Sequence, residues 1–125
     1  LKNQSSLIDE LISNADLINS TKFIFNNLPD IADLKEFGTK VYDKCNENSI
    51  VLLGTINNKK PMVFCAVTSD NTSKIHAGNI VREIGQFMGG GGGGKPHLAT
   101  AGGKDISKLI DALEFGRNKI MDLIK

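Results

Sequence analysis

Residues 49–68 read SIVLLGTINNKKPMVFCAVT, and this stretch decides what kind of fold the chain can adopt. Two apolar runs rich in β-branched residues, 49–56 and 61–68, flank the polar segment Asn57-Asn58-Lys59-Lys60. Apolar runs of this length are typical of strands, and a short polar segment between them is typical of a hairpin turn. The sequence therefore predicts a β-hairpin here.

The chain before this hairpin predicts further elements on the N-terminal side. They are, in order, a helix, two short strands and a second helix, at residues 1–15, 16–18, 22–28 and from Pro29-Asp30 onward. Asp30 is the expected N-cap of the second helix. Residues 1–14 also show apolar spacings of seven, so they are either the end of a helical or coiled-coil region that precedes a globular part, residues 15–125, or a helix packed on that part.

The chain after the hairpin predicts a helix, a short strand-like segment and a last helix, at residues 74–88, 97–101 and 106–124. Gly78 and Gly85 lie inside the first of these helices, where each costs about 1 kcal/mol relative to alanine. Their missing side chains would let that helix approach another backbone closely. The order of elements predicts an α/β (α+β) fold in which one mixed β-sheet is flanked by helices.

Composition indicates a globular chain of about one domain, with 125 residues, 40% hydrophobic and 23% charged. The longest apolar runs fall far short of the ~20 residues that span a bilayer, and the N-terminus lacks a signal-peptide core. We therefore expect a cytoplasmic protein with no membrane partner, and the initial Leu1 suggests a fragment of something larger. Cys45 and Cys65 show no metal-ligand spacing, so buried reduced thiols are expected, with a disulfide or a reactive thiol as the other interpretation.

Residues 89–94 are six consecutive glycines. Glycine loses more backbone entropy on ordering than any other residue, so a chain keeps such a run either as a linker or because a ligand approaches its backbone closely. Its position inside a domain favours a binding loop whose N–H groups face an anion. Pro96 stands where a P-loop needs Ser or Thr, and the run follows a helix instead of a strand, which argues against nucleotide-binding loops.

Positive charge gathers around this run, although the net charge of the whole chain is only +1. Residues 74–104 contain four Lys or Arg side chains against Glu83 alone, which indicates an anionic partner. Lys95 either contacts phosphate or is a solvated surface charge, and His97 either contacts ligand or is structural. The candidate binding residues are Gly89, Gly90, Gly91, Gly92, Gly93, Gly94, Lys95, His97, Lys74, Arg82 and Lys104.

Aromatic content is only 6%, with no Trp, which gives little support for stacking of single-stranded bases. A nucleic-acid partner would then be held through backbone and shape contacts, as structured RNA is. No Ser/His/Asp arrangement, metal cluster or carboxylate pair stands out, so we expect neither a catalytic centre nor a metal site in this chain.

Several motifs together resemble the DHH-associated domain that ends alanyl-tRNA synthetases. They are Ala77-Gly78, Ile80-Val81-Arg82-Glu83, the glycine run, Lys95-Pro96, Leu98-Ala99, Ala101-Gly102-Gly103 and Lys104-Asp105. The resemblance is strongest over about residues 74–110. Lys95 replaces an Arg of the synthetase form, which keeps the charge but loses the planar fork. His97 replaces an Asp and partly resembles the form found in DHH phosphoesterases.

The resemblance implies an accessory domain that holds tRNA and bridges the aminoacylation and editing domains of an alanine–tRNA ligase. It implies ATP, magnesium and zinc for the parent enzyme, and no cofactor in this chain. The implied partners are alanine-specific tRNA, other domains of the same chain, and a second copy through the N-terminal helical region. Two alternatives remain open: a substrate-binding domain of a DHH-type phosphoesterase or alanyl-tRNA trans-editing hydrolase, and a structural dimerisation domain.

Overall fold

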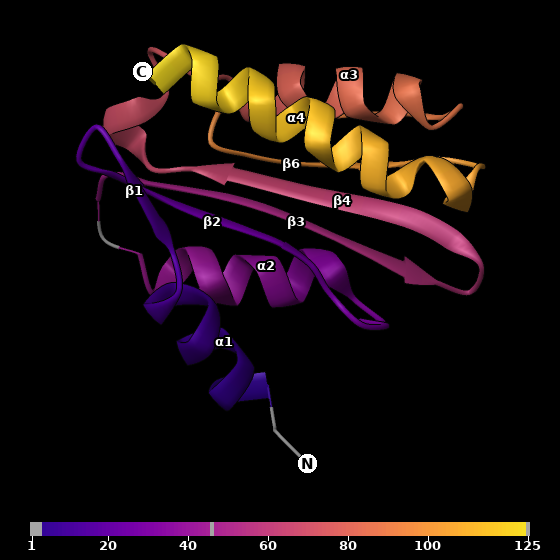
Figure 1. Ribbon diagram of the computed structural model, residues 1–125, viewed down its shortest axis with the longest axis horizontal. Coiled ribbons are helices and arrows are strands. Elements are labelled where there is room, and N and C mark those ends of the chain that lie inside the picture. The colour runs from indigo at the N-terminus through magenta and orange to yellow at the C-terminus, as the bar shows by residue number, and fades with distance from the viewer. Residues whose placement is uncertain (1–3, 46, 125) are drawn as a thin grey trace.

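The computed structural model describes residues 4–45 and 47–124, which form one six-stranded sheet between two layers of helices (Figure 1). The strands are β1 Asp16–Ile18, β2 Thr21–Asn27, β3 Ser49–Asn57, β4 Lys60–Val67, β5 Gly91–Gly94 and β6 Leu98–Gly102, in the spatial order β1-β2-β3-β4-β6-β5. The helices are α1 Gln4–Ser13, α2 Leu34–Asp43, α3 Ala77–Phe87 and α4 Leu109–Ile124, with single 3-10 turns at Ser69–Asn71 and Ile106–Lys108. The predicted mixed sheet flanked by helices is confirmed.

The predicted hairpin is the centre of this sheet. β3 and β4 pair antiparallel from Ile50↔Val67 to Asn57↔Lys60. Asn58 and Lys59 turn the chain with φ angles of 52° and 61°, the left-handed conformation that a two-residue hairpin turn requires. β2 pairs parallel with β3 and the remaining pairs are antiparallel, so the sheet is mixed.

Neighbouring residues of the central strands enter two separate cores. Leu52 and Cys65 pack beneath α3 and α4, whereas Leu53 and Phe64 pack against α1 and α2. All four side chains are fully buried. Figure 1 shows the two helical pairs on opposite faces of the sheet. Because both faces are covered, β3 and β4 have continuous apolar runs and do not alternate with polar residues.

The α2 helix begins later than the sequence predicts. Asp33, not Asp30, is the N-cap, and its Oδ1 accepts a hydrogen bond from an N–H of the first turn at 3.0 Å. Asp30 instead accepts a hydrogen bond from the side-chain amide of Asn57, and the N–H of Ile31 donates to Thr55 Oγ1 at 3.2 Å. These two contacts with β3 keep the residues around Asp30 outside the helix.

Three other boundaries differ from the expected ones. α3 begins at Ala77 with His76 as N-cap, so the expected start at Lys74 is wrong. The last helix is preceded by a separate 3-10 turn at Ile106–Lys108. The glycine run does not form a loop throughout, because its last four residues are the strand β5.

The first helix, α1, packs on the face that carries α2. Ile8 and Leu11 are buried in the same core as Leu34. The division of the chain after residue 14 stays a prediction, and Leu1 of the heptad spacing lies outside the described residues. In the part of the chain that the structure describes, every helix is too short or too polar to cross a bilayer.

Candidate nucleic-acid interface

The first glycine of the run ends α3. Gly89 has a φ angle of 75°, in the left-handed region that favours glycine. The N–H of Gly90 donates to the Gly85 carbonyl at 2.8 Å, and the N–H of Gly89 donates to the Gln86 carbonyl at 3.1 Å. This pair of hydrogen bonds is the Schellman arrangement of a helix C-terminus. Gly89 therefore serves as a helix cap.

The last four glycines form β5, the edge strand of the sheet. β5 pairs antiparallel with β6 in the register Gly91↔Gly102, Gly92↔Ala101, Gly93↔Thr100 and Gly94↔Ala99. Strand pairing satisfies the backbone groups on one side only, so β5 presents the other side as an edge without side chains.

A tight turn closes the β5–β6 hairpin and fixes its position. The N–H of Lys95 donates to the Leu98 carbonyl at 3.0 Å, with Pro96 and His97 between them. The Pro96 carbonyl accepts a hydrogen bond from the N–H of Ala77, the first residue of α3, at 2.8 Å. The His97 carbonyl accepts one from the last residue of β4, also at 2.8 Å. Two neighbouring elements thus hold the turn that carries Lys95 and His97.

The helix α3 lies directly on β5, as its two glycines predicted. A Cβ atom on Gly78 would stand 2.7 Å from the Gly94 carbonyl oxygen. A Cβ atom on Gly85 would stand 2.9 Å from the Gly91 carbonyl carbon. Real Cβ contacts are not this short, so any larger residue at either helix position would push α3 off the strand.

Within β5 and its approach, Gly91 is the one glycine that the fold itself does not require. A Cβ atom on Gly90 would overlap the backbone of residues 102 and 103, and one on Gly92 would overlap Ala101. Gly93 and Gly94 have φ angles of 156° and 155°, which side-chain-bearing residues rarely adopt. Gly91 has neither constraint, since no atom lies within 4 Å of the position that a Cβ would take there and its φ is not positive.

One face of the β5–β6 ribbon stays open. The two alanines of β6 point into the core beneath α3, whereas Leu98 packs with the α2 core. Side chains alternate along a strand, so Thr100 and Gly102 also face the α2 side, as does Gly91, the partner of Gly102. α2 itself packs on β3 and β4. The exposed floor beside it therefore consists of small residues.

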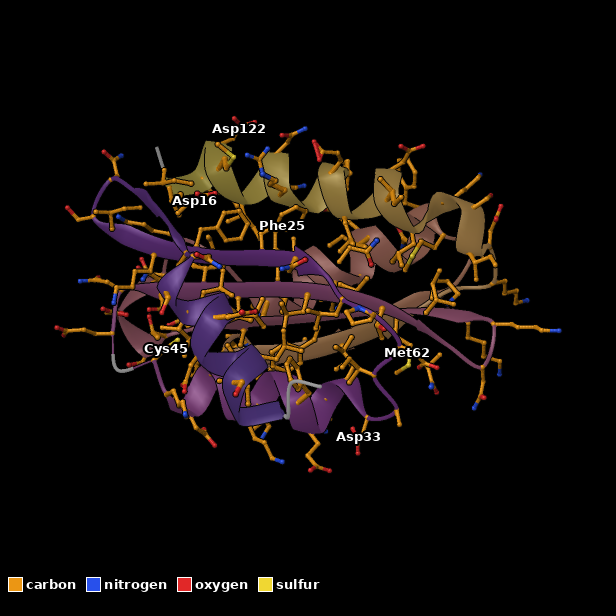
Figure 2. The ribbon with its side chains drawn as sticks, turned by 60° about the horizontal axis from the view of Figure 1, so that its bottom comes forward. Asp16, Phe25, Asp33, Cys45, Met62 and Asp122 are labelled. Carbon is orange, nitrogen blue, oxygen red and sulfur yellow. The ribbon has the colours of Figure 1, made fainter. Side chains whose placement is uncertain are left out.

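Two hollows lie over this floor. The α2 hollow, of about 400 Å³, lies between α2 and the far end of β5, and its lining includes Lys35, Thr39, Gly93, Gly94, Lys95, His97 and Thr100. The turn hollow, of about 670 Å³, lies beside the β3–β4 turn, and its lining includes Asn57, Lys60, Met62, Gly90, Gly91, Gly102 and Lys104. Figure 2 brings the α1–α2 face forward. In this view Asp33, at the start of α2, lies on the same side of the molecule as Met62, and Cys45 lies on the other side.

Residues 21–122 match the family model of the DHHA1 domain. The chain belongs to the DHHA1 domain family. It is 41% identical over 115 residues to an alanine–tRNA ligase of Dehalococcoides mccartyi, which covers 90% of this chain and 13% of the ligase. The predicted membership in the DHH-associated domains of alanyl-tRNA synthetases is thereby confirmed. This DHHA1 domain spans about an eighth of the length of the curated relatives it matches.

Solved structures share the fold of this DHHA1 domain. The C-Ala domain of Aquifex aeolicus alanyl-tRNA synthetase superposes with a TM-score of 0.72 at 18% identity, covering 89% of this chain and 97% of that domain. A pGpG-specific phosphodiesterase from Vibrio superposes with a TM-score of 0.55 at 15% identity, covering 98% of this chain and 40% of that protein. At these identities the comparison concerns the fold alone.

In this DHHA1 domain the predicted cationic side chains lie in two groups, on opposite sides of β5. Lys95 and His97 line the α2 hollow and Lys104 lines the turn hollow, whereas Lys74 and Arg82 lie on the opposite side of β5. There they line a third hollow, the α3–α4 hollow, of about 460 Å³, with His76, Asn79, Glu83 and Lys119. Arg82 links the groups, because its Nη2 lies 4.0 Å from the Cβ position of Gly93.

Glu83, the one acidic residue of segment 74–104, already forms a salt bridge within the domain. Its carboxylate binds Lys119 of α4, with 2.6 Å between Oε2 and Nζ. The Arg82 guanidinium donates to the side chain of Asn79 at 3.3 Å. The α3–α4 hollow of this domain therefore keeps a positive excess from Lys74 and Arg82.

The structure adds functional candidates that the sequence analysis missed. Lys35 and Lys60 lie in the same hollows as Lys95 and Lys104, but neither is near the glycine run in sequence. Phe87 and Phe115 stack at a ring-centroid distance of 5.8 Å and are exposed by 42% and 38%. Low aromatic content did not indicate this pair, because the pair forms only where α3 crosses α4.

Two kinds of chemistry concern the described side chains, thiol reactivity at the cysteines and metal binding by His, Cys, Asp and Glu. Burial raises the pKa of the Cys65 thiol to about 12, and burial also raises the pKa of half-buried Cys45. Both thiols are free. Within residues 4–45 and 47–124, no three His, Cys, Asp or Glu side chains come together as metal ligands would.

Proposed function

We propose that this DHHA1 domain is the tRNA-binding accessory domain of an alanine–tRNA ligase. In this role it would hold tRNA and bridge the aminoacylation and editing domains of the parent chain. The proposal is supported by the identity of 41% to an alanine–tRNA ligase, well above the 15% identity to the phosphodiesterase. The candidate RNA-binding residues are the glycine run together with Lys74, Arg82, Lys95, His97 and Lys104.

The observation that carries this proposal is the unobstructed position of Gly91. The fold requires glycine at the neighbouring positions but leaves open space beside Gly91. Cations lie beyond both ends of β5, with Lys95 at one end and Lys104 at the other. A bare backbone between two cations suits a sugar–phosphate chain, because phosphate contacts from Lys and backbone N–H groups supply most of the affinity for nucleic acid.

The proposal assigns the remaining chemistry to parts of a longer parent chain. ATP, magnesium and zinc would serve the ligase outside this domain, and the cytoplasm would be its compartment. α1 would continue into a helical region through which two copies associate. The 13% share of the ligase that the chain covers leaves ample length for these parts.

The test is titration of the 125-residue chain into fluorescently labelled alanine tRNA, followed by anisotropy at increasing salt. We expect binding at low salt that weakens steeply as salt rises, since each neutralised phosphate releases counterions. Absence of binding at low salt would rule out the proposal. Weaker binding of a single-stranded RNA of equal length would support recognition of folded RNA.

The alternative functions predict other results. A phosphoesterase substrate domain would bind a short dinucleotide at least as well as tRNA, so pGpG serves as the competitor in the same titration. A purely structural dimerisation domain would sediment as a dimer, become a monomer when residues 1–14 are removed, and bind no RNA.

A further inference from the structure

The α2 hollow and the turn hollow share one strand and one face. β5 contributes Gly93 and Gly94 to the first hollow and Gly91 to the second. Both hollows open on the α2 side of the sheet, where Thr100 lines the first and Gly102, two residues along β6, lines the second. The two hollows therefore lie at the two ends of the same face of the β5–β6 ribbon.

Each end of this surface carries two lysines from elements far apart in sequence. Lys35 of α2 and Lys95 of the β5–β6 turn line the α2 hollow. Lys60 at the start of β4 and Lys104 after β6 line the turn hollow. Within the described residues none of the four forms a salt bridge, whereas Lys44 binds Asp9 and Lys119 binds Glu83.

The carboxylates at the margin of the surface are occupied locally. Asp30 accepts a hydrogen bond from Asn57 at 2.6 Å. Asp105 accepts hydrogen bonds from the N–H and the hydroxyl of Ser107, the first at 3.0 Å. These hydrogen bonds come from neutral groups, and among the described residues neither carboxylate forms a salt bridge with one of the four lysines. The lysine ammonium groups therefore keep their capacity for an external anion.

The length of the surface fits several phosphates of one strand. A β-strand advances about 3.3 Å per residue, so Gly91 and Gly94 are on the order of 10 Å apart along β5. A strand edge of this length can lie beside more than one phosphate of the same RNA strand.

We propose that the α2-side face of β5 and β6 is a phosphate-binding track, with Lys35 and Lys95 at one end, Lys60 and Lys104 at the other, and Gly91 on its floor beside Lys60 and Lys104. Its ligand is the sugar–phosphate backbone of RNA. The track rests on the proposed RNA-binding function and specifies where the RNA lies. It assigns Lys35 and Lys60 as phosphate contacts.

The test compares Lys35→Ala, Lys60→Ala and their combination with Lys22→Ala. Lys22 is exposed on β2, three strands away from β6, and its removal changes the net charge equally. Binding to alanine tRNA is measured over a range of salt concentrations, and circular dichroism checks that each variant is folded. We expect each single track variant to bind several-fold more weakly and to lower the slope of log K against log salt by about 1, and the double variant by about 2. Lys22→Ala should change neither value appreciably.

A fifth variant, Gly91→Leu, obstructs the floor without removing charge. Its side chain would enter open space, so the fold should persist while tRNA affinity falls with little change of the salt slope. If the wild type binds tRNA but the track variants bind as Lys22→Ala does, the track is wrong and the RNA-binding function stands. If the wild type does not bind tRNA, both proposals fail.

Discussion

Gly78 of α3 lies directly against Gly94 of β5, because a Cβ atom on Gly78 would stand 2.7 Å from the Gly94 carbonyl oxygen. Replacing Gly78 with alanine should therefore destabilise the domain, although alanine favours a helix by about 1 kcal/mol. The obstructing atom belongs to the backbone, so relief requires moving α3 or β5, at a cost of roughly 1–3 kcal/mol. Urea unfolding measures the change, and an unchanged or higher midpoint would contradict the contact.

Gly91 and Gly92 are neighbours in sequence and should respond oppositely to alanine. Gly91→Ala places its methyl group in open space and should leave the free energy of unfolding unchanged or slightly raised. Gly92→Ala would press against Ala101 of β6 and should lower it by roughly 1–3 kcal/mol. The pair serves as its own control in one urea titration. Equal losses would mean that the pairing of β5 with β6 is wrong.

Asp33 should contribute to stability as the N-cap of α2. Asp33→Ala removes the carboxylate that accepts from the first-turn N–H at 3.0 Å and should lower the free energy of unfolding by about 1 kcal/mol. Asn at position 33 should restore most of the loss, since its side-chain oxygen can accept the same hydrogen bond. Failure of Asn to recover stability in thermal or urea unfolding would show that the loss has another cause.

The positions of β3 and β4 were predictable because burial on both faces leaves continuous apolar runs in these two strands. The α2 cap was not, since the contacts of Asp30 and Ile31 with β3 that displace the helix start join residues at least 24 positions apart. The sequence predicts a binding loop at Gly91–Gly94, because glycine is costly to order and the run lies inside a domain. Its strand conformation comes from pairing with β6, which local sequence does not record.

The candidate site was predictable in its glycines and its neighbouring cations but not in its shape. Lys35 and Lys60 join Lys95 and Lys104 only through the strand order, which places β5 at the edge beyond β6. Likewise, one consecutive segment carries Lys74, Arg82 and Lys95, yet the sheet separates them onto two faces. Charge along the sequence indicates an anionic partner, whereas the geometry determines which cations can touch it together.

The free energy of unfolding should fall as the pH rises above 9, because the buried Cys65 thiol stays protonated in the folded domain. Burial raises the pKa of its thiol from 9.0 to about 12. Its contribution to stability is therefore complete below pH 9, where the thiol is protonated in both states. It is lost between pH 9 and about 12, where the unfolded chain releases the proton and the folded chain does not. Comparing urea unfolding of wild type and Cys65→Val across this range should show a shallower decline for the variant.

The same thiol should resist alkylation in the native state. The thiolate is the reactive form, and Cys65 is fully buried as well as protonated. Native iodoacetamide labelling followed by mass spectrometry should modify Cys45 first, and urea should expose both. Rapid native labelling of Cys65 would contradict its burial.

Glu83 should restrain RNA binding at the α3–α4 hollow. Its carboxylate holds Lys119 at 2.6 Å and partly cancels Lys74 and Arg82 in the same hollow. Glu83→Gln releases Lys119, so tRNA affinity should rise several-fold at low salt with a steeper salt dependence. Stability should fall by about 1 kcal/mol or less, because the pair is partly exposed. Glu114→Gln, which makes the same charge change at an exposed site on α4, serves as the control. A gain shared equally by both variants would reflect net charge alone. No gain in either variant would mean that the RNA does not contact this hollow.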